Sequence, residues 1–202
     1  MKRKLAATGL LFVAWALSIT FVPNLQTVTN GQVQQKSNAQ LSPTDRQAVA
    51  RFETRVKDYV KLRNRVKSKL PGLSKDSTPE QIETYRKNFE AALRSARMGA
   101  KPNDIFNHEG ADYIRRTLKT EFKGRDRAEL REIVFEAENE TIPLRVNYPY
   151  PETKELTEMP ATLLLQLPQL PKEVRYRFVG RNMLLVDRDN NLIIDYMLNA
   201  LP

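Results

Sequence analysis

The stretch RFVGRNMLLVDRDNNLIIDYM, residues 177–197, decides the fold at the C-terminal end of the chain. Its apolar and β-branched runs are separated by Gly180-Arg181-Asn182 and by residues 188–191, which are rich in residues that favour turns. With the run just before it, the stretch predicts an antiparallel meander. The three expected strands cover about 174–179, 183–187 and 192–196.

The acidic and amide residues at the centre of this stretch raise the question of a metal site. Asp187, Asp189 and Asn191 place oxygen ligands at alternate positions, as the first half of a calcium loop does. Leu192 then stands where such a loop needs Gly, and Leu198 stands where a bidentate Glu belongs. The pattern therefore favours a hairpin turn, and we assign no metal.

Two capping sequences predict helices upstream. Ser42-Pro43-Thr44-Asp45 and Thr78-Pro79-Glu80-Gln81 each combine a capping hydroxyl, a Pro at the first helical position and an acid in the first turn. The first helix carries an apolar seam, up to Pro71, that we expect to dock on the protein's own helices, although Arg63 interrupts it. The seam consists of Val49, Phe52, Val56, Tyr59, Arg63, Val66 and Leu70.

Further helices are expected after the second cap. The second helix presents Ile82, Tyr85, Phe89, Leu93 and Ala96 on one face, with Gly99 past its end. Asn107 is expected to cap a third helix, and Asp126 with Glu129 a fourth. Frequent prolines after residue 140 exclude another long helix and leave room only for a helical turn at 161–167. The fold class predicted is α+β, with about four helices, a proline-rich segment and a three-stranded meander.

The N-terminus predicts export. Lys2, Arg3 and Lys4 precede the apolar run 5–22, which suits a signal peptide that is cleaved or one that stays as a membrane anchor. The expected organisation is a signal or anchor over 1–22, a polar tether over 23–41 and a single α+β domain over 42–202. That domain is helical over 42–139 and proline-rich and β over 140–202. A periplasmic or extracellular location follows, with inner-membrane anchoring left open.

One resemblance agrees with export. The region LPQLPKEVRYRFVGRNMLLVDRDNNLIID, residues 167–195, with DIF at 104–106 and LRVNYPYPE at 144–152, resembles a family of exported bacterial proteins without an assigned function. The likeness covers about residue 62 to the end. It implies an extracytoplasmic α+β domain and brings no activity, cofactor or partner.

Composition excludes much catalytic chemistry. The chain has no Cys and one His, so disulfides, thiolate zinc sites and Cys nucleophiles are ruled out. His108, near Glu109 and Asp112, and the acids of 129–140 are the residues left for a His- or carboxylate-dependent hydrolase, our alternative hypothesis. At the start of a helix, however, an Asn-His-Glu sequence is ordinary capping chemistry. We assign no catalytic residue and no cofactor.

Charge supplies the one positive indication of function. Residues 41–70 hold nine Lys or Arg against three acids, whereas 71–202 hold twenty against twenty-one. We predict a basic patch on the first helix, made by Lys57, Lys61, Arg65 and Lys69, that binds an acidic envelope component or protein partner. The cations of 57–69 spread around most of the helix, which argues against a membrane-inserting helix, and an exported protein is not expected to bind nucleic acid. The same cations are also explained by an ordinary solvated face, which the sequence favours over a binding patch. The function we predict is a non-enzymatic binding or scaffolding module with a basic first helix.

Overall fold

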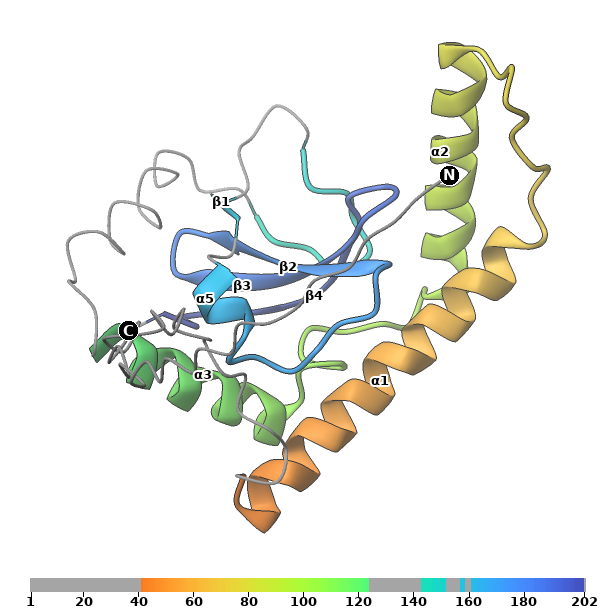
Figure 1. Ribbon diagram of the computed structural model, residues 1–202. Helices are drawn as coiled ribbons and strands as arrows, with labels where there is room; N and C mark the ends of the chain where they lie inside the picture. The colour runs from red at the N-terminus through yellow and green to blue at the C-terminus, as the bar shows by residue number, and fades with distance from the viewer. Residues whose placement is uncertain (1–40, 124–142, 152–156, 159–160, 202) are drawn as a thin grey trace, which may run out of the picture. The chain divides into compact units, whose positions relative to one another are not determined.

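The meander lies at the centre of the fold (Figure 1). The computed structural model describes residues 41–123, 143–151, 157–158 and 161–201, all within one unit of the chain, 33–202. The α+β class and the antiparallel sheet are confirmed. The elements are α1 (Pro43–Lys67), α2 (Pro79–Ala96), α3 (His108–Lys123), β1 (Thr157–Glu158), α5 (Ala161–Leu164), β2 (Val174–Val179), β3 (Asn182–Asp187) and β4 (Ile193–Met197).

The sheet has the order β1-β2-β3-β4, with every neighbouring pair antiparallel. The three predicted strands are present as β2, β3 and β4, and the two-residue β1 adds an edge strand that was not predicted. Gly180, with φ of 50°, sits in the β2–β3 turn, and Asn191, with φ of 54°, ends the β3–β4 turn. Both residues tolerate this left-handed conformation, so the turn chemistry read from the sequence holds.

The helix caps also follow the sequence. The Ser42 hydroxyl accepts from the Asp45 N–H at 3.1 Å, and Thr78 with Gln81 forms a complete capping box. The Asn107 side chain accepts from the Gly110 N–H at 2.8 Å, which caps α3. The described residues hold three long helices where about four were expected, because the helix predicted at 126–134 lies outside the described part of the chain.

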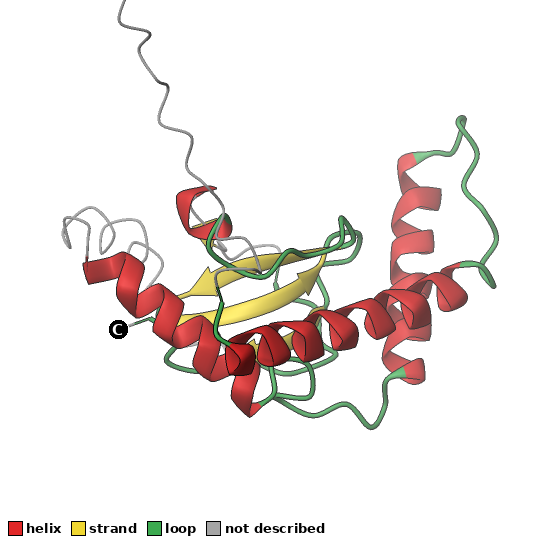
Figure 2. Cartoon of the chain, turned by 60° about the horizontal axis from the view of Figure 1, so that its bottom comes forward, coloured by secondary structure: helices red, strands yellow, loops and turns green. Residues whose placement is uncertain are grey.

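Two apolar layers cover the sheet. On one face, α1 and α3 pack through Phe52, Val56 and Ile114 on side chains of β2 and β3, such as Phe178 and Leu185 (Figures 1 and 2). On the other face, a smaller cluster joins Leu184, Val186 and Ile193 to Tyr150 and Leu144 of the 143–151 segment. Residues of β3 alternate between the two clusters, which explains why Met183 to Val186 are all buried.

A β-bulge in β4 shifts the pairing register between β3 and β4. Leu185 pairs with Asp195 and Val186 with Ile193, so Ile194 is the extra residue on β4. Ile193 belongs to the smaller apolar cluster, whereas Ile194 belongs to the larger one. Ile193 and Ile194 point to opposite faces as consecutive strand residues do, and the extra residue keeps Ile193 opposite Val186 and Asp195 opposite Leu185, so that each pair shares a face.

Asp195 is a buried carboxylate that binds β4 to the loop before α3. Its two oxygens accept from the backbone N–H groups of Asn103, Ile105 and Phe106 at 2.7, 2.8 and 2.9 Å, and from Tyr196 at 2.8 Å. Burial raises the pKa of this carboxyl, and the four backbone donors oppose that rise. Asp195 therefore supplies the hydrogen-bond acceptors for loop N–H groups that are not bonded within a helix or a strand.

Arg97, just after α2, makes the equivalent link on another side of β4. Its guanidinium donates to Asn147 Oδ1 at 2.6 Å and to the Ile194 carbonyl at 2.9 Å. Asn147 in turn donates from its side chain to the Arg97 carbonyl and from its backbone to the Ile193 carbonyl at 2.8 Å. The Arg97 side chain thus joins the α2 C-terminus to the sheet, and backbone hydrogen bonds to residues 191–193 also hold the 143–151 segment there.

Replacing Asp195 tests the loop contact. We expect Asp195→Ala to lower the free energy of unfolding by about 3 kcal/mol or more, because it leaves buried N–H groups without acceptors at roughly 1–3 kcal/mol each. Urea denaturation of the full chain measures the loss. Asp76→Ala, at an exposed loop position, is the control and should stay within about 0.5 kcal/mol of wild type. A loss below 1 kcal/mol at position 195 would contradict this assignment.

Candidate functional site

The buried side of α1 determines which of its residues face outward. Phe52, Val56 and Tyr59 of the predicted seam are buried, as is Arg63 at 3% exposure. The expectation that α1 docks on the protein's own helices is confirmed, since it contacts α2 and α3. The view that Arg63 interrupts the seam is wrong, because Arg63 continues the buried face as a paired charge.

Arg63 meets the acids of the β3–β4 hairpin. Its Nε donates to Asp187 Oδ2 at 2.6 Å, and its Nη2 bonds to Asp189. The Tyr59 hydroxyl donates to the same Asp187 oxygen at 2.7 Å, and Lys67 Nζ reaches Asp189 at 2.8 Å. We call Tyr59, Arg63, Lys67, Asp187 and Asp189 the helix–hairpin network.

Two further features of this network are a contact with an aromatic ring and a shifted pKa. The guanidinium of Arg63 lies over the Phe89 ring of α2, 5.2 Å from its centroid, which adds a cation–π contact. Burial, together with the charge of Asp187 and the hydrogen bond to it, raises the pKa of Tyr59 well above its ordinary value. The hydroxyl therefore keeps its proton and remains the donor to Asp187.

The hairpin acids do more than turn the chain. The Asp189 N–H donates to Asp187 Oδ1 at 2.9 Å and the Leu192 N–H donates to Asn190 Oδ1 at 3.0 Å, which are local turn contacts. Asp187 and Asp189 also bind α1, a function that sequence reasoning missed. An arginine within an apolar seam and an aspartate within a buried strand were the signal that could have linked them.

A basic stripe covers the opposite side of α1. Lys57, Lys61, Arg65 and Lys69 are all exposed. Positions four apart advance by only about 40° around a helix, so the first three form one row, and Lys69 continues it in the turn after the helix. Lys61 pairs with Asp58 at 3.0 Å, whereas Lys57, Arg65 and Lys69 form no ion pair with any residue that the structure describes.

Packing changes the interpretation of the charge distribution. On a helical wheel the cations of 57–69 surround the helix, but Arg63 and Lys67 turn toward the hairpin and are paired with its acids. The remaining cations share one face. The apolar face of α1 is occupied by the domain, which supports the expectation that this helix does not insert into a membrane.

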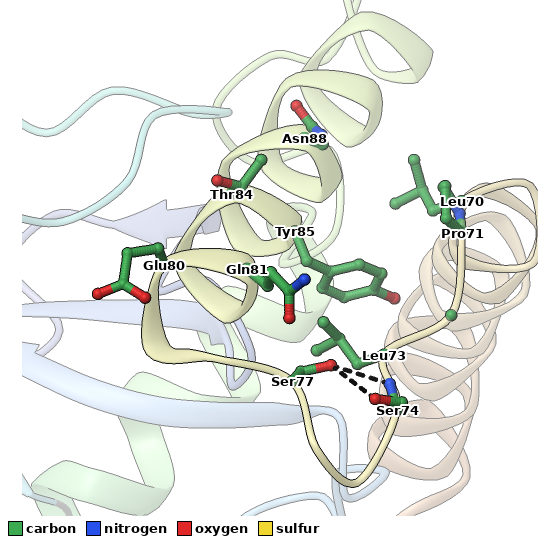
Figure 3. Close-up of a pocket in the computed structure, with 11 residues that line it drawn as sticks. Leu70, Pro71, Leu73, Ser74, Ser77, Glu80, Gln81, Thr84, Tyr85 and Asn88 are labelled. Atoms are coloured by element: carbon green, nitrogen blue, oxygen red, sulfur yellow. Dashed lines mark hydrogen bonds between the residues drawn. The ribbon is translucent and has the colours of Figure 1, made fainter.

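A groove lies beyond the end of the stripe. It has a volume of about 470 Å³ and lies between α2 and the connection from α1, as Figure 3 shows. The Tyr85 ring faces Leu70 and Leu73 across it, and Glu80 is the one charged lining residue. Ile82, expected on the buried face of α2, is 49% exposed, whereas Tyr85, three residues on, packs against the larger core cluster.

The residues considered for catalysis or metal binding are not assembled into a site. His108 is exposed, at 87% of its side chain, and contacts Asp112 at 3.1 Å. The acids at 129–140 lie outside the described residues. Asp187 and Asp189 face cations, and Asn191 Oδ1 accepts from Arg175 at 2.5 Å, so all three candidate calcium ligands already have protein partners. Within the described ranges no three His, Asp or Glu residues form a metal-binding group.

Membrane and family comparisons complete the description. None of the helices in the described residues is long and apolar enough to cross a bilayer, and the apolar run 5–22 lies outside those residues. The fold and stripe define an α+β protein with a basic helix on its surface. The chain matches no protein-family model, no curated protein and no solved structure. The resemblance to an exported bacterial family therefore stays a prediction.

Breaking the helix–hairpin network should be costly. We expect Arg63→Met to lower the free energy of unfolding by about 3–5 kcal/mol, because it leaves the buried charge of Asp187 without its cation. The double variant Arg63→Met/Asp187→Asn should lose less than the sum of the two single variants. Urea unfolding measures each. Lys61→Met, which breaks only an exposed pair, is the control and should cost less than about 1 kcal/mol. Additive single and double losses would count against the pairing.

The network also predicts a dependence on acid. Burial alone would raise the pKa of Asp189, but hydrogen bonds and charges from Lys67 and Arg63 more than offset this and lower it. A carboxyl whose pKa is lower when folded stabilises the fold above its unfolded pKa, about 3.9. The contribution is lost as pH falls from there through the folded pKa. Urea midpoints across this range should therefore fall less steeply for Asp189→Asn than for wild type, and parallel curves would refute the assignment.

Proposed function

We propose that the protein is a non-enzymatic binding or scaffolding module of the cell envelope that docks an acidic partner on the basic stripe of α1. The observation that carries the proposal is the row of exposed cations Lys57, Lys61, Arg65 and Lys69 on the side of α1 opposite its buried face. Export rests on the basic N-terminus and the apolar run 5–22.

The stripe suits electrostatic docking on a fixed surface. Cations four residues apart repel each other by roughly 0.2–0.5 kcal/mol per pair, and an acidic partner would relieve this repulsion. From Lys57 to Arg65 the row spans about 12 Å at 1.5 Å per residue, enough to face several carboxylates. The helix–hairpin network holds the backbone of α1 in place, so the conformational entropy lost on binding is mainly that of the exposed side chains, roughly 0.5–1.5 kcal/mol each. An acidic protein surface fits this rigid, flat row better than a bilayer interior does.

Charge reversal tests the proposal directly. The full chain is titrated with a fluorescent polyglutamate peptide as a defined acidic partner, and separately with vesicles of phosphatidylglycerol. We expect wild type to bind the peptide with an affinity that falls as salt rises. Changing Lys57, Lys61, Arg65 and Lys69 to Glu should weaken binding at least tenfold.

A matched variant separates position from net charge. Lys75, Lys101, Lys119 and Lys123 are exposed and lie outside α1, so changing them to Glu alters the net charge by the same amount. This control should keep most of the affinity. Equal losses in both variants would mean that only net charge matters. Vesicle binding that the stripe variant loses, without any binding of the peptide, would replace the acidic protein by a lipid surface.

The alternative of a hydrolase has a separate test. His108 with Asp112 is the one described acid–base pair that supports it. Ester, phosphate and glycoside substrates are assayed with wild type and His108→Ala. Turnover that the substitution abolishes would favour this alternative over a binding module, and the charge-reversed stripe variant should leave such turnover unchanged.

A further inference from the structure

A second basic site lies beside strand β2 of the sheet. It is a cavity of about 320 Å³ between the segment that follows α5 and strand β2, and none of its lining residues belongs to the basic stripe. This volume is at the lower end of the range for small-molecule sites, roughly 300–1,000 Å³. Its lining residues are Leu164, Leu165, Pro168, Gln169, Leu170, Pro171, Lys172, Val174, Arg175, Tyr176, Arg177 and Arg188.

Apolar side chains form one part of the cavity wall. They come from the 164–171 segment, where Leu164 is 43% exposed. The segment is held in place because the Tyr176 hydroxyl donates to the Pro168 carbonyl at 3.0 Å. Tyr176 itself is buried and stacks on Phe52, with ring centroids 6.4 Å apart. The apolar wall is therefore tied to the core of the domain.

Cations form the rest of the wall. Lys172, Arg175, Arg177 and Arg188 line the cavity, and no carboxylate is among the lining residues that the structure describes. The backbone of Arg188 is fixed by its N–H, which donates to the Glu173 carbonyl at 2.9 Å. Arg175 is oriented by its hydrogen bond to Asn191 at 2.5 Å. Lys172 and Arg188 are exposed and make no ion pair within the described part of the chain.

We propose that this cavity binds the oxyanion group, carboxylate or phosphate, of a small amphiphilic ligand whose apolar chain lies against the 164–171 segment. The exposed Arg188 guanidinium can donate two parallel hydrogen bonds to a carboxylate or phosphate, and the Lys172 ammonium adds a second cation to the same wall. The apolar wall supplies the area that gives affinity, while the cations determine orientation and charge selectivity. This site is independent of the proposed docking function of α1.

Defined probes test the ligand class. The full chain is titrated by calorimetry with octanoate, octyl phosphate, octylammonium, octanol and inorganic phosphate, with the amphiphilic ions below their critical micelle concentrations and octanol below its solubility limit. We expect octanoate or octyl phosphate to saturate one site, and the cationic and neutral probes to bind at least tenfold more weakly. Tighter binding of octyl phosphate would point to a phosphate-bearing lipid, and tighter binding of octanoate to a fatty acid. Equally tight binding of octylammonium, or of inorganic phosphate, would overturn the proposal.

Substitutions at exposed positions locate the site. Lys172→Gln/Arg188→Gln should weaken the binding of octanoate and octyl phosphate at least tenfold. Leu164→Gln should also weaken the binding of these two probes, but should leave the binding of inorganic phosphate unchanged. The control Lys57→Gln/Lys61→Gln removes the same charge from the stripe and should leave probe binding unchanged. Thermal melting verifies that each variant is folded. Binding that survives the first substitution, or that is lost equally in the control, would refute this cavity as the site.

Discussion

The contact of Arg63 with Asp187 is the constraint on which the surface of this protein depends. The two residues lie 124 positions apart in the chain, yet their buried charges meet at 2.6 Å. An apolar seam alone specifies the position of a helix weakly, because its spacing repeats every turn. A buried ion pair has one register that satisfies it, and every other register leaves a charge unpaired in the core. The pair therefore determines which face of α1 packs and which face carries Lys57, Lys61 and Arg65.

The same logic extends to the other long-range polar contacts of the hairpin. Asp195 holds the loop before α3, and Arg97 holds the end of α2 and the 143–151 segment. Each joins elements whose sequence positions are far apart, and each satisfies backbone groups that would otherwise lie buried without partners. The C-terminal meander is consequently the hub to which the helices are attached. This agrees with the sequence analysis, in which residues 177–197 determine the fold of the C-terminal part of the chain.

Local rules explain what the sequence could predict. Caps at Ser42 and Thr78, turns at Gly180 and Asn191, and the strands between them depend on neighbouring residues, and all are present in the structure. The partner of Arg63 depends on tertiary packing, which no local pattern encodes. For that reason a helical wheel alone overstated how far the exposed positive charge extends around α1. Ile82 shows a second limit of prediction from the sequence. Periodicity identifies the apolar face of a helix, but it does not show whether another part of the protein covers that face.

Charge is distributed in the structure according to burial. Where cations of α1 face the domain, acids of the hairpin neutralise them, since an unpaired buried charge would be too costly. Where cations face solvent, on the stripe and around the cavity beside β2, the domain places few acids among them. Repulsion there is weakened by water and salt, so the fold tolerates it without internal compensation. The excess positive charge is thus concentrated on surfaces that face solvent. For the stripe this arrangement favours binding of anions that arrive from outside, because the helix–hairpin network already places the backbone that carries the cations and only their exposed side chains must be ordered on binding.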